Sequence, residues 1–122
     1  MPLYICFCPD AQGAFDKRGE ARADHLAMGQ KDRADGKTVF GRVFIDDSVS
    51  HHEDRSPPTA VDHDHLSPGT KGSTMIYRYH TIEQAWDRLR ADPYWLKGVW
   101  DKEKATIHEL APSSTDETMK LI

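Results

Sequence analysis

The chain has 122 residues, of which 38% are hydrophobic and 30% charged, and its formal net charge is −4. This length favours a single domain with one core. The negative charge argues against a nucleic-acid partner, which requires a basic surface, and no apolar run approaches the roughly 18 residues of a membrane span. The first residues lack the basic start of a secretory leader and soon reach Pro9 and Asp10, so we expect a cytoplasmic protein.

The first predicted element is a strand over residues 3–8, an apolar run that Pro9 and Asp10 end. It carries Cys6 and Cys8, the two cysteines of the chain. Side chains two positions apart on a strand point to one face, about 7 Å from each other, which is too far for a relaxed disulfide. We therefore expect two reduced thiols in the core, as in a reducing compartment.

Residues 16–35 form a predicted helix, with Asp16 as its N-cap and Gly36 as its stop signal. A thin apolar stripe, which we expect to pack against a sheet, recurs at helical spacing. This stripe comprises Ala23, Leu26, Ala27, Gln30 and Ala34. Beside it runs a polar stripe that can border a cavity. The polar stripe comprises Arg18, Arg22, His25 and Gly29.

Residues 38–45 form a second predicted strand and residues 73–80 a third. The long irregular stretch between them, residues 46–72, is a natural candidate for a lid. Its imidazole and carboxylate groups leave a zinc, nickel or iron site open as an alternative. No helical pair fixes these groups, so we expect neither a metal nor another cofactor. The groups belong to His51, His52, Asp62, His63, Asp64 and His65.

Two capping signals place the remaining helices. Thr81 and Gln84 have the spacing of a capping box, which predicts a helix that begins immediately after Thr81. Asp92 can cap a further short helix whose first residue is Pro93. A fourth strand is predicted over residues 102–110.

The predicted order is β-α-β-β-α-β, that of a ferredoxin-like α+β domain with a four-stranded antiparallel sheet and helices on one face. We assign this domain to residues 1–110 and a polar tail to residues 111–122. The other face of the sheet would be a large apolar patch, which monomers rarely expose. We therefore expect a homodimer, although a bound ligand or the tail folded back would also cover part of the patch. The patch is expected to contain Phe40, Phe44, Tyr77 and Tyr79.

Several short motifs occur in an order typical of one family. They are Arg18…Arg22-Ala23-Asp24-His25-Leu26, Gly72-Ser73-Thr74, Glu83-Gln84-Ala85, Asp92-Pro93-Tyr94 and Gly98-Val99-Trp100. Over residues 3–110 the chain resembles the YCII-related family of dimeric α/β-barrel proteins. The resemblance implies a small cytoplasmic protein with a ferredoxin-like fold and a His/Asp-centred active site, here His25 and Asp92. The wider superfamily resembles muconolactone isomerases, cofactor-free quinone-forming monooxygenases and ligand-binding stress proteins.

The chemistry that these residues can perform is cofactor-free proton transfer. Histidine titrates near neutrality, so His25 is a candidate general acid and base, and Asp92 would orient the imidazole and stabilise its charged form. Arg18 and Arg22 would bind a carboxylate, phenolate or enolate. An aromatic pocket would be lined by Tyr77, Tyr94 and Trp95.

Two classes of function remain open. The first is a cofactor-independent lyase or isomerase that acts on a small cyclic or aromatic metabolite through His25. The alternative is a non-catalytic small-molecule-binding or accessory protein, which needs the same pocket but no acid/base pair. Helix capping alone accounts for Asp92. In either case we expect a small molecule and a second copy of the chain as partners, and neither nucleic acid nor a membrane.

Overall fold

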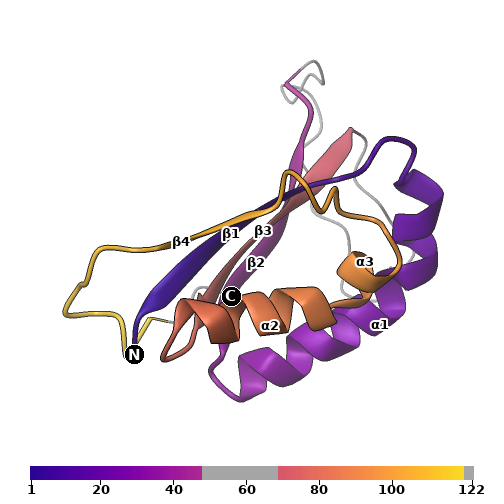
Figure 1. The fold of residues 1–122 in the computed structure, drawn as a ribbon. Coiled ribbons are helices and arrows are strands. Elements are labelled where there is room, and N and C mark those ends of the chain that lie inside the picture. The colour runs from indigo at the N-terminus through magenta and orange to yellow at the C-terminus, as the bar shows by residue number, and fades with distance from the viewer. Residues whose placement is uncertain (48–68, 120–122) are drawn as a thin grey trace, which may run out of the picture.

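The computed structural model describes residues 1–47 and 69–119. The chain folds into a four-stranded antiparallel sheet with its helices on one face (Figure 1). The strands are β1 (Leu3–Pro9), β2 (Thr38–Ile45), β3 (Thr70–Arg78) and β4 (Thr106–Glu109), and the helices are α1 (Phe15–Ala34), α2 (Ile82–Ala91) and α3 (Pro93–Leu96). The predicted ferredoxin-like α+β fold is confirmed.

The sheet has the order β2-β3-β1-β4, so β1 and β3 lie at its centre. Cys6 of β1 lies opposite Met75 of β3 and Ile107 of β4, and all three are buried beneath the helices. Cys6 and Cys8 are both free and fully buried. Burial raises the pKa of the Cys8 thiol to about 12, which keeps it protonated. The prediction of two unpaired core thiols is confirmed.

Both predicted caps of the later helices are present. The Thr81 hydroxyl accepts from the Gln84 N–H at 3.2 Å, and the Gln84 side chain accepts from the Thr81 N–H at 3.2 Å. Asp92 caps α3 by accepting the Tyr94 N–H at 2.9 Å, and Pro93 occupies the first turn. Asp92 therefore lies at the junction of α2 and α3, four residues after Arg88.

The orientation of α1 corrects the sequence prediction. The helix begins at Phe15 with Ala14 as N-cap, and Gly36, whose φ is +74°, follows its end. Its buried residues are Arg18, Ala21 and Asp32, whereas most of the predicted apolar stripe faces solvent. The physical reason is that alanine side chains gain little from burial, while the polar stripe finds charged partners beneath the helix.

The outer face of the sheet also differs from the prediction in one respect. Tyr77 lies opposite Tyr4 in the β1–β3 register, and both are buried on the helix side, where the predicted patch residue Tyr79 also packs against the core. Because strand side chains alternate, the neighbouring Ile76 points outward instead. We call the resulting surface the outer apolar face; it comprises Ile5, Phe7, Phe40, Phe44 and Ile76.

The C-terminal tail covers one end of this face. Arg78, at the end of β3, donates to the carbonyls of Asp116 at 2.6 Å and Met119 at 2.9 Å, and to that of Gly36 at 2.7 Å. Leu3, opposite Arg78 in the register, is only 1% exposed. The tail leaves the other end open, where Phe7 is 48% exposed.

The remaining differences concern boundaries. β3 begins at Thr70, three residues earlier than predicted, and β4 is shorter than residues 102–110. Most of the predicted lid, with its histidines, lies outside the described residues. Within the described part of the chain, no helix has the length and apolar character that would let it cross a membrane.

Candidate active site

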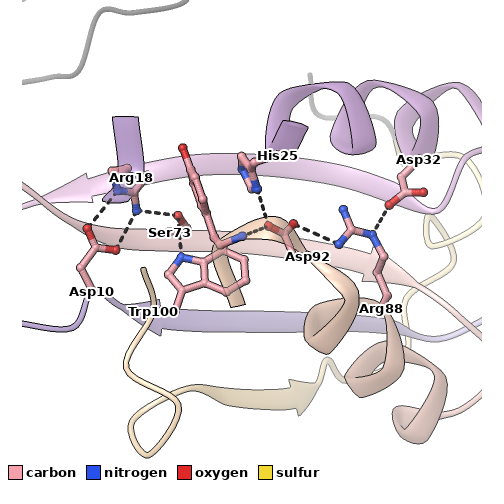
Figure 2. Close-up of polar contacts among 9 residues, drawn as sticks. Asp10, Arg18, His25, Asp32, Ser73, Arg88, Asp92 and Trp100 are labelled. Carbon is pink, nitrogen blue, oxygen red and sulfur yellow. Dashed lines mark hydrogen bonds and ion pairs between the residues drawn. The ribbon is translucent and has the colours of Figure 1, made fainter. Parts of the chain in front are cut away.

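His25 and Asp92, which are 67 positions apart in the sequence, form a hydrogen-bonded pair (Figure 2). The distance from His25 Nδ1 to Asp92 Oδ1 is 2.7 Å. The Asp92 side chain is 1% exposed and that of His25 is 20% exposed. An ionised carboxylate only accepts hydrogen bonds, so Nδ1 carries the proton and Nε2 is the basic nitrogen of the neutral ring.

The Asp92 carboxylate is held as an anion by further donors. Its Oδ1 also accepts the Tyr94 N–H at 2.9 Å, and its Oδ2 accepts from Arg88 Nη1 at 3.0 Å. Burial alone would raise the pKa of Asp92. The hydrogen bond and charge of His25, the Tyr94 N–H and the Arg88 guanidinium outweigh burial and hold that pKa below its usual value.

The chain of charges continues beyond Arg88. Its Nε donates to Asp32 Oδ2, so that Asp32, Arg88, Asp92 and His25 form one connected row (Figure 2). Arg88 also lies over the ring of Tyr77, 5.4 Å from its centroid. We call these four residues the charge chain.

A second polar network lies beside the first. Arg18 donates to both carboxylate oxygens of Asp10, at 2.9 and 2.8 Å, and to the Ser73 hydroxyl at 3.0 Å. The indole N–H of Trp100 donates to the same hydroxyl at 3.2 Å. Arg18 is 1% exposed, so this bidentate pair is a buried one.

The Tyr94 ring joins the two networks. It stacks on His25 with a centroid distance of 3.8 Å and an interplanar angle of 9°, and the guanidinium of Arg18 lies 4.7 Å from its centroid. Trp100 meets it edge-on at 5.6 Å. Burial raises the pKa of Tyr94, and the charges of Arg18 and Arg22 offset only part of this increase. The Tyr94 hydroxyl therefore stays neutral at physiological pH.

The structure separates the predicted site residues into groups. His25, Asp92 and Tyr94 are in direct contact, and Arg22 is half-buried on the same helix. Arg18 is fully enclosed in its own network. Tyr77 lies beneath Arg88, and its buried hydroxyl has no hydrogen-bond partner among the described residues. Trp95 packs instead against Trp86 at 6.4 Å and under the Lys102 ammonium.

Sequence analysis missed the residues that support the pair. On α1 a signal was present, because polar residues at positions 18, 25 and 32 repeat every seven residues, which places them on one side of the helix. Arg88 is likewise one helical turn before Asp92. The contribution of residues from the strands and loops has no comparable signal. The missed residues are Asp10, Asp32, Ser73, Arg88 and Trp100.

A hollow of about 640 Å³ opens at one end of the charge chain. It lies where the end of α1 meets the start of α2 and the end of β3. Asp32 and Arg88 line it, together with Arg78 and Tyr79, whereas His25 and Asp92 do not. The outer end of the charge chain therefore faces a space of ligand size.

Comparison with known proteins identifies the family. The chain matches the family model of the YCII-related domain over residues 2–106. The chain belongs to the YCII-related family. Protein YciI of Escherichia coli O6:H1 is 29% identical over 100 residues, which cover 81% of this chain and 88% of that protein. The suspected family membership is thus confirmed.

Two further similarities are more remote. The Aspercryptin biosynthesis cluster protein B of Emericella nidulans is 38% identical over 48 residues, which cover 35% of this chain and only 31% of that protein. The solved structure of the 5-chloro-2-hydroxyhydroquinone dehydrochlorinase TftG from Burkholderia phenoliruptrix AC1100, in complex with 2,5-dihydroxybenzoquinone, has a TM-score of 0.65. It is 17% identical, and the alignment covers 91% of this chain and 95% of that chain. At this identity the likeness concerns the fold.

Proposed function

We propose that this YCII-related protein is a cofactor-independent enzyme of the lyase or isomerase type, in which His25 moves a proton on a small cyclic or aromatic metabolite. The observation that carries the proposal is the 2.7 Å contact between His25 Nδ1 and the buried Asp92 carboxylate. A histidine whose Nδ1–H is held by a carboxylate presents a basic Nε2, which is the arrangement that general-base catalysis requires.

In the proposed reaction, Nε2 of His25 takes a proton from an O–H or acidic C–H group of the substrate. The electron pair of that bond forms a new C=O or C=C bond. In an elimination, a leaving group departs with its own bonding electrons and the imidazolium then releases its proton to solvent; in an isomerisation, His25 returns the proton to another carbon. Asp92 stabilises the imidazolium formed in between. No oxidant or reductant is consumed, which is consistent with a cofactor-free site.

The substrate class follows from the side chains around His25. Tyr94 and Trp100, which are 2% and 1% exposed, form a buried aromatic wall that supports the imidazole, and we assign a planar substrate ring to the exposed side of His25. Arg22 precedes His25 by one helical turn, so we assign to it the developing phenolate or enolate charge. We assign to Arg18 the support of this wall through Tyr94. The similar fold of a dehydrochlorinase whose substrate is a hydroxylated ring adds support.

We further propose that the active species is a homodimer in the cytoplasm. The outer apolar face, with Phe7 48% exposed, is the surface that a second copy would cover. Two free buried thiols are typical of a reducing compartment.

The test is a comparison of wild-type protein with His25→Ala. Each is incubated with a panel of chlorinated and unchlorinated hydroxyhydroquinones and with a metabolite extract, and consumption is followed by mass spectrometry. We expect His25→Ala to lower the rate by about 10²-fold or more. Asp24→Ala, which removes an exposed side chain next to His25 on α1, is the matched control. A folded His25→Ala protein with the wild-type rate would refute the proposal.

The hollow of about 640 Å³ favours a second candidate, a non-catalytic small-molecule-binding protein, because a ligand there would not touch His25. Binding of a compound without turnover, unaffected by His25→Ala but lost on substitution of Tyr79, would support this candidate. Turnover that depends on His25 would exclude it.

A further inference from the structure

We infer that Arg88, held in place by Asp32, is the positioning residue that aims the Asp92 carboxylate at His25 and so selects the tautomer of the imidazole. The catalytic consequence of this role rests on the function proposed above. The geometric role does not, because it concerns contacts within the chain alone.

Capping of α3 does not by itself explain how Asp92 is oriented. The cap requires one carboxylate oxygen, Oδ1, which accepts the Tyr94 N–H. A single hydrogen bond to that oxygen restrains rotation about the Cβ–Cγ bond only weakly. Arg88 Nη1 binds the other oxygen, Oδ2, at 3.0 Å and thereby fixes the plane of the group. Oδ1 then faces Nδ1 of His25 at 2.7 Å.

Asp32 gives Arg88 its own fixed position. Arg88 Nε donates to Asp32 Oδ2 in a buried contact, while Nη1 serves Asp92, so one planar guanidinium bridges the two carboxylates. His25 and Asp32 lie seven residues apart on α1, and Arg88 lies four residues before Asp92 on the facing elements. The charge chain therefore links α1 to the α2–α3 junction at two points, through Asp32 and Arg88 and through His25 and Asp92.

The burial of the charge chain favours a positioning role over a role in packing the helices together. The Arg88 side chain is 7% exposed, that of Asp32 11% and that of Asp92 1%. Replacing buried ion pairs by apolar residues is often neutral or stabilising, so helix packing alone would not need these charges. Among the described residues, the other titratable or charged groups near His25 and Asp92 include Arg18, Arg22, Tyr77, Tyr94 and Cys8.

The tautomer of His25 can be read without any substrate. In protein labelled with ¹⁵N-histidine, at mildly alkaline pH, we expect the wild-type His25 signals to show a protonated Nδ1 and a bare Nε2, with a downfield Nδ1–H proton. In Arg88→Met we expect that proton signal to be lost and the two tautomers to mix. Asp32→Asn should cause the same change to a smaller degree. Arg90→Met, which removes an exposed arginine two residues away that lies over Trp86, should change nothing.

Rescue separates positioning from a general loss of structure. Arg88→Lys keeps the charge and should retain the Nδ1–H signal in part. Arg88→Ala should regain the signal when ethylguanidinium is added, since the hollow lined by Arg88 and Asp32 admits an ion of that size. If Arg88→Met does not fold, Arg88→Lys and Asp32→Asn decide the question. Wild-type His25 signals in folded Arg88→Met would overturn the inference. It would also be overturned if Asp32→Asn showed wild-type signals and ethylguanidinium failed to restore the Nδ1–H signal of Arg88→Ala.

The outcome is independent of the proposed function. If the tautomer depends on Arg88 while His25→Ala leaves turnover unchanged, the positioning role stands and the acid/base function fails. If turnover depends on His25 while the tautomer is the same with and without Arg88, the acid/base function stands and the positioning role fails.

Discussion

The two faces of the sheet differ in what completes them: the inner face packs an apolar core and several paired charges against the helices, whereas the outer face lies open at one end. The inner face, covered by the helices, contains buried charges such as Arg18, Arg88 and Asp92. The outer face presents aromatic and aliphatic groups, and the stacked pair Phe7 and Phe44, 4.8 Å apart, lies at its open end. Charged residues are almost never fully buried unless paired, and large exposed apolar patches commonly mark interaction sites.

This difference shows which groups find their partners within one chain and which surface is left for another molecule to cover. On the inner face, every charge named above has a partner within the chain, and these partners come from α1, α2, β3 and the loops between them. Among the described residues, the outer face is covered only at the end where the tail binds Arg78. The inner face therefore determines the geometry of the candidate site, and the outer face is suited to assembly.

The largest effect is expected where the inner face loses a charge. Arg18→Met would leave Asp10 without the two hydrogen bonds of its bidentate partner and would remove a donor to Ser73. Breaking one side of a buried ion pair costs about 3–5 kcal/mol. We expect a loss of that size in the free energy of unfolding, measured by urea denaturation.

The neighbouring residue supplies the control for Arg18. Lys17 is exposed, and Lys17→Met should change the free energy of unfolding by no more than about 0.5 kcal/mol. The double variant Asp10→Asn/Arg18→Met should lose less than the sum of the two single variants, because the pair is coupled. Equal losses in Lys17→Met and Arg18→Met would show that the buried network contributes no specific stability.

A smaller effect is expected on the outer face, and it concerns association. We expect the wild-type protein to be a dimer at micromolar concentration and Phe7→Glu to raise its dissociation constant about 100-fold, since burial of a phenylalanine contributes roughly 1.5–3 kcal/mol. Light scattering across a dilution series measures both. Phe15→Glu, at an equally exposed phenylalanine on α1, should dimerise as the wild type does. A single wild-type species of 13.9 kDa would instead show a face that needs no second copy.

The parts of the fold that sequence predicted correctly depend on short stretches of chain. The capping box at Thr81 and Gln84, the cap at Asp92 and the bounds of β2 all follow from residues within one or two turns. The burial of Cys6 and Cys8 on one face follows from the alternation of strand side chains alone. Such local patterns need no knowledge of what lies opposite.

The parts that sequence did not predict depend on partners far along the chain. Arg18 meets Ser73 across 55 positions, and Arg88 meets Asp32 across 56. Without those partners the sequence placed the polar stripe of α1 only at the border of a cavity, and the inward face was assigned to the alanines. The outward direction of Ile76 in place of Tyr77 likewise depended on the register between β1 and β3.

The smallest effect, and the one that sharpens the comparison most, is the response of the inner face to acid. His25, the Tyr94 N–H and Arg88 outweigh burial and hold the pKa of Asp92 in the folded chain below its usual value. A carboxyl whose folded pKa is depressed adds stability that is fully present above the unfolded pKa and is lost as the pH falls through the folded one. We therefore expect the urea midpoint of the wild type to fall as the pH is lowered below about 4.

Asp92→Asn isolates this contribution. Asparagine still caps a helix but cannot titrate, so the variant should be less stable near neutrality and should lose less stability on acidification than the wild type. Asp87→Asn, at an exposed position of α2, should follow the wild-type curve. Parallel acid curves for wild type and Asp92→Asn would mean that the charge on Asp92 does not stabilise the fold. The charge chain would then act through its effect on His25, which the imidazole signals measure directly.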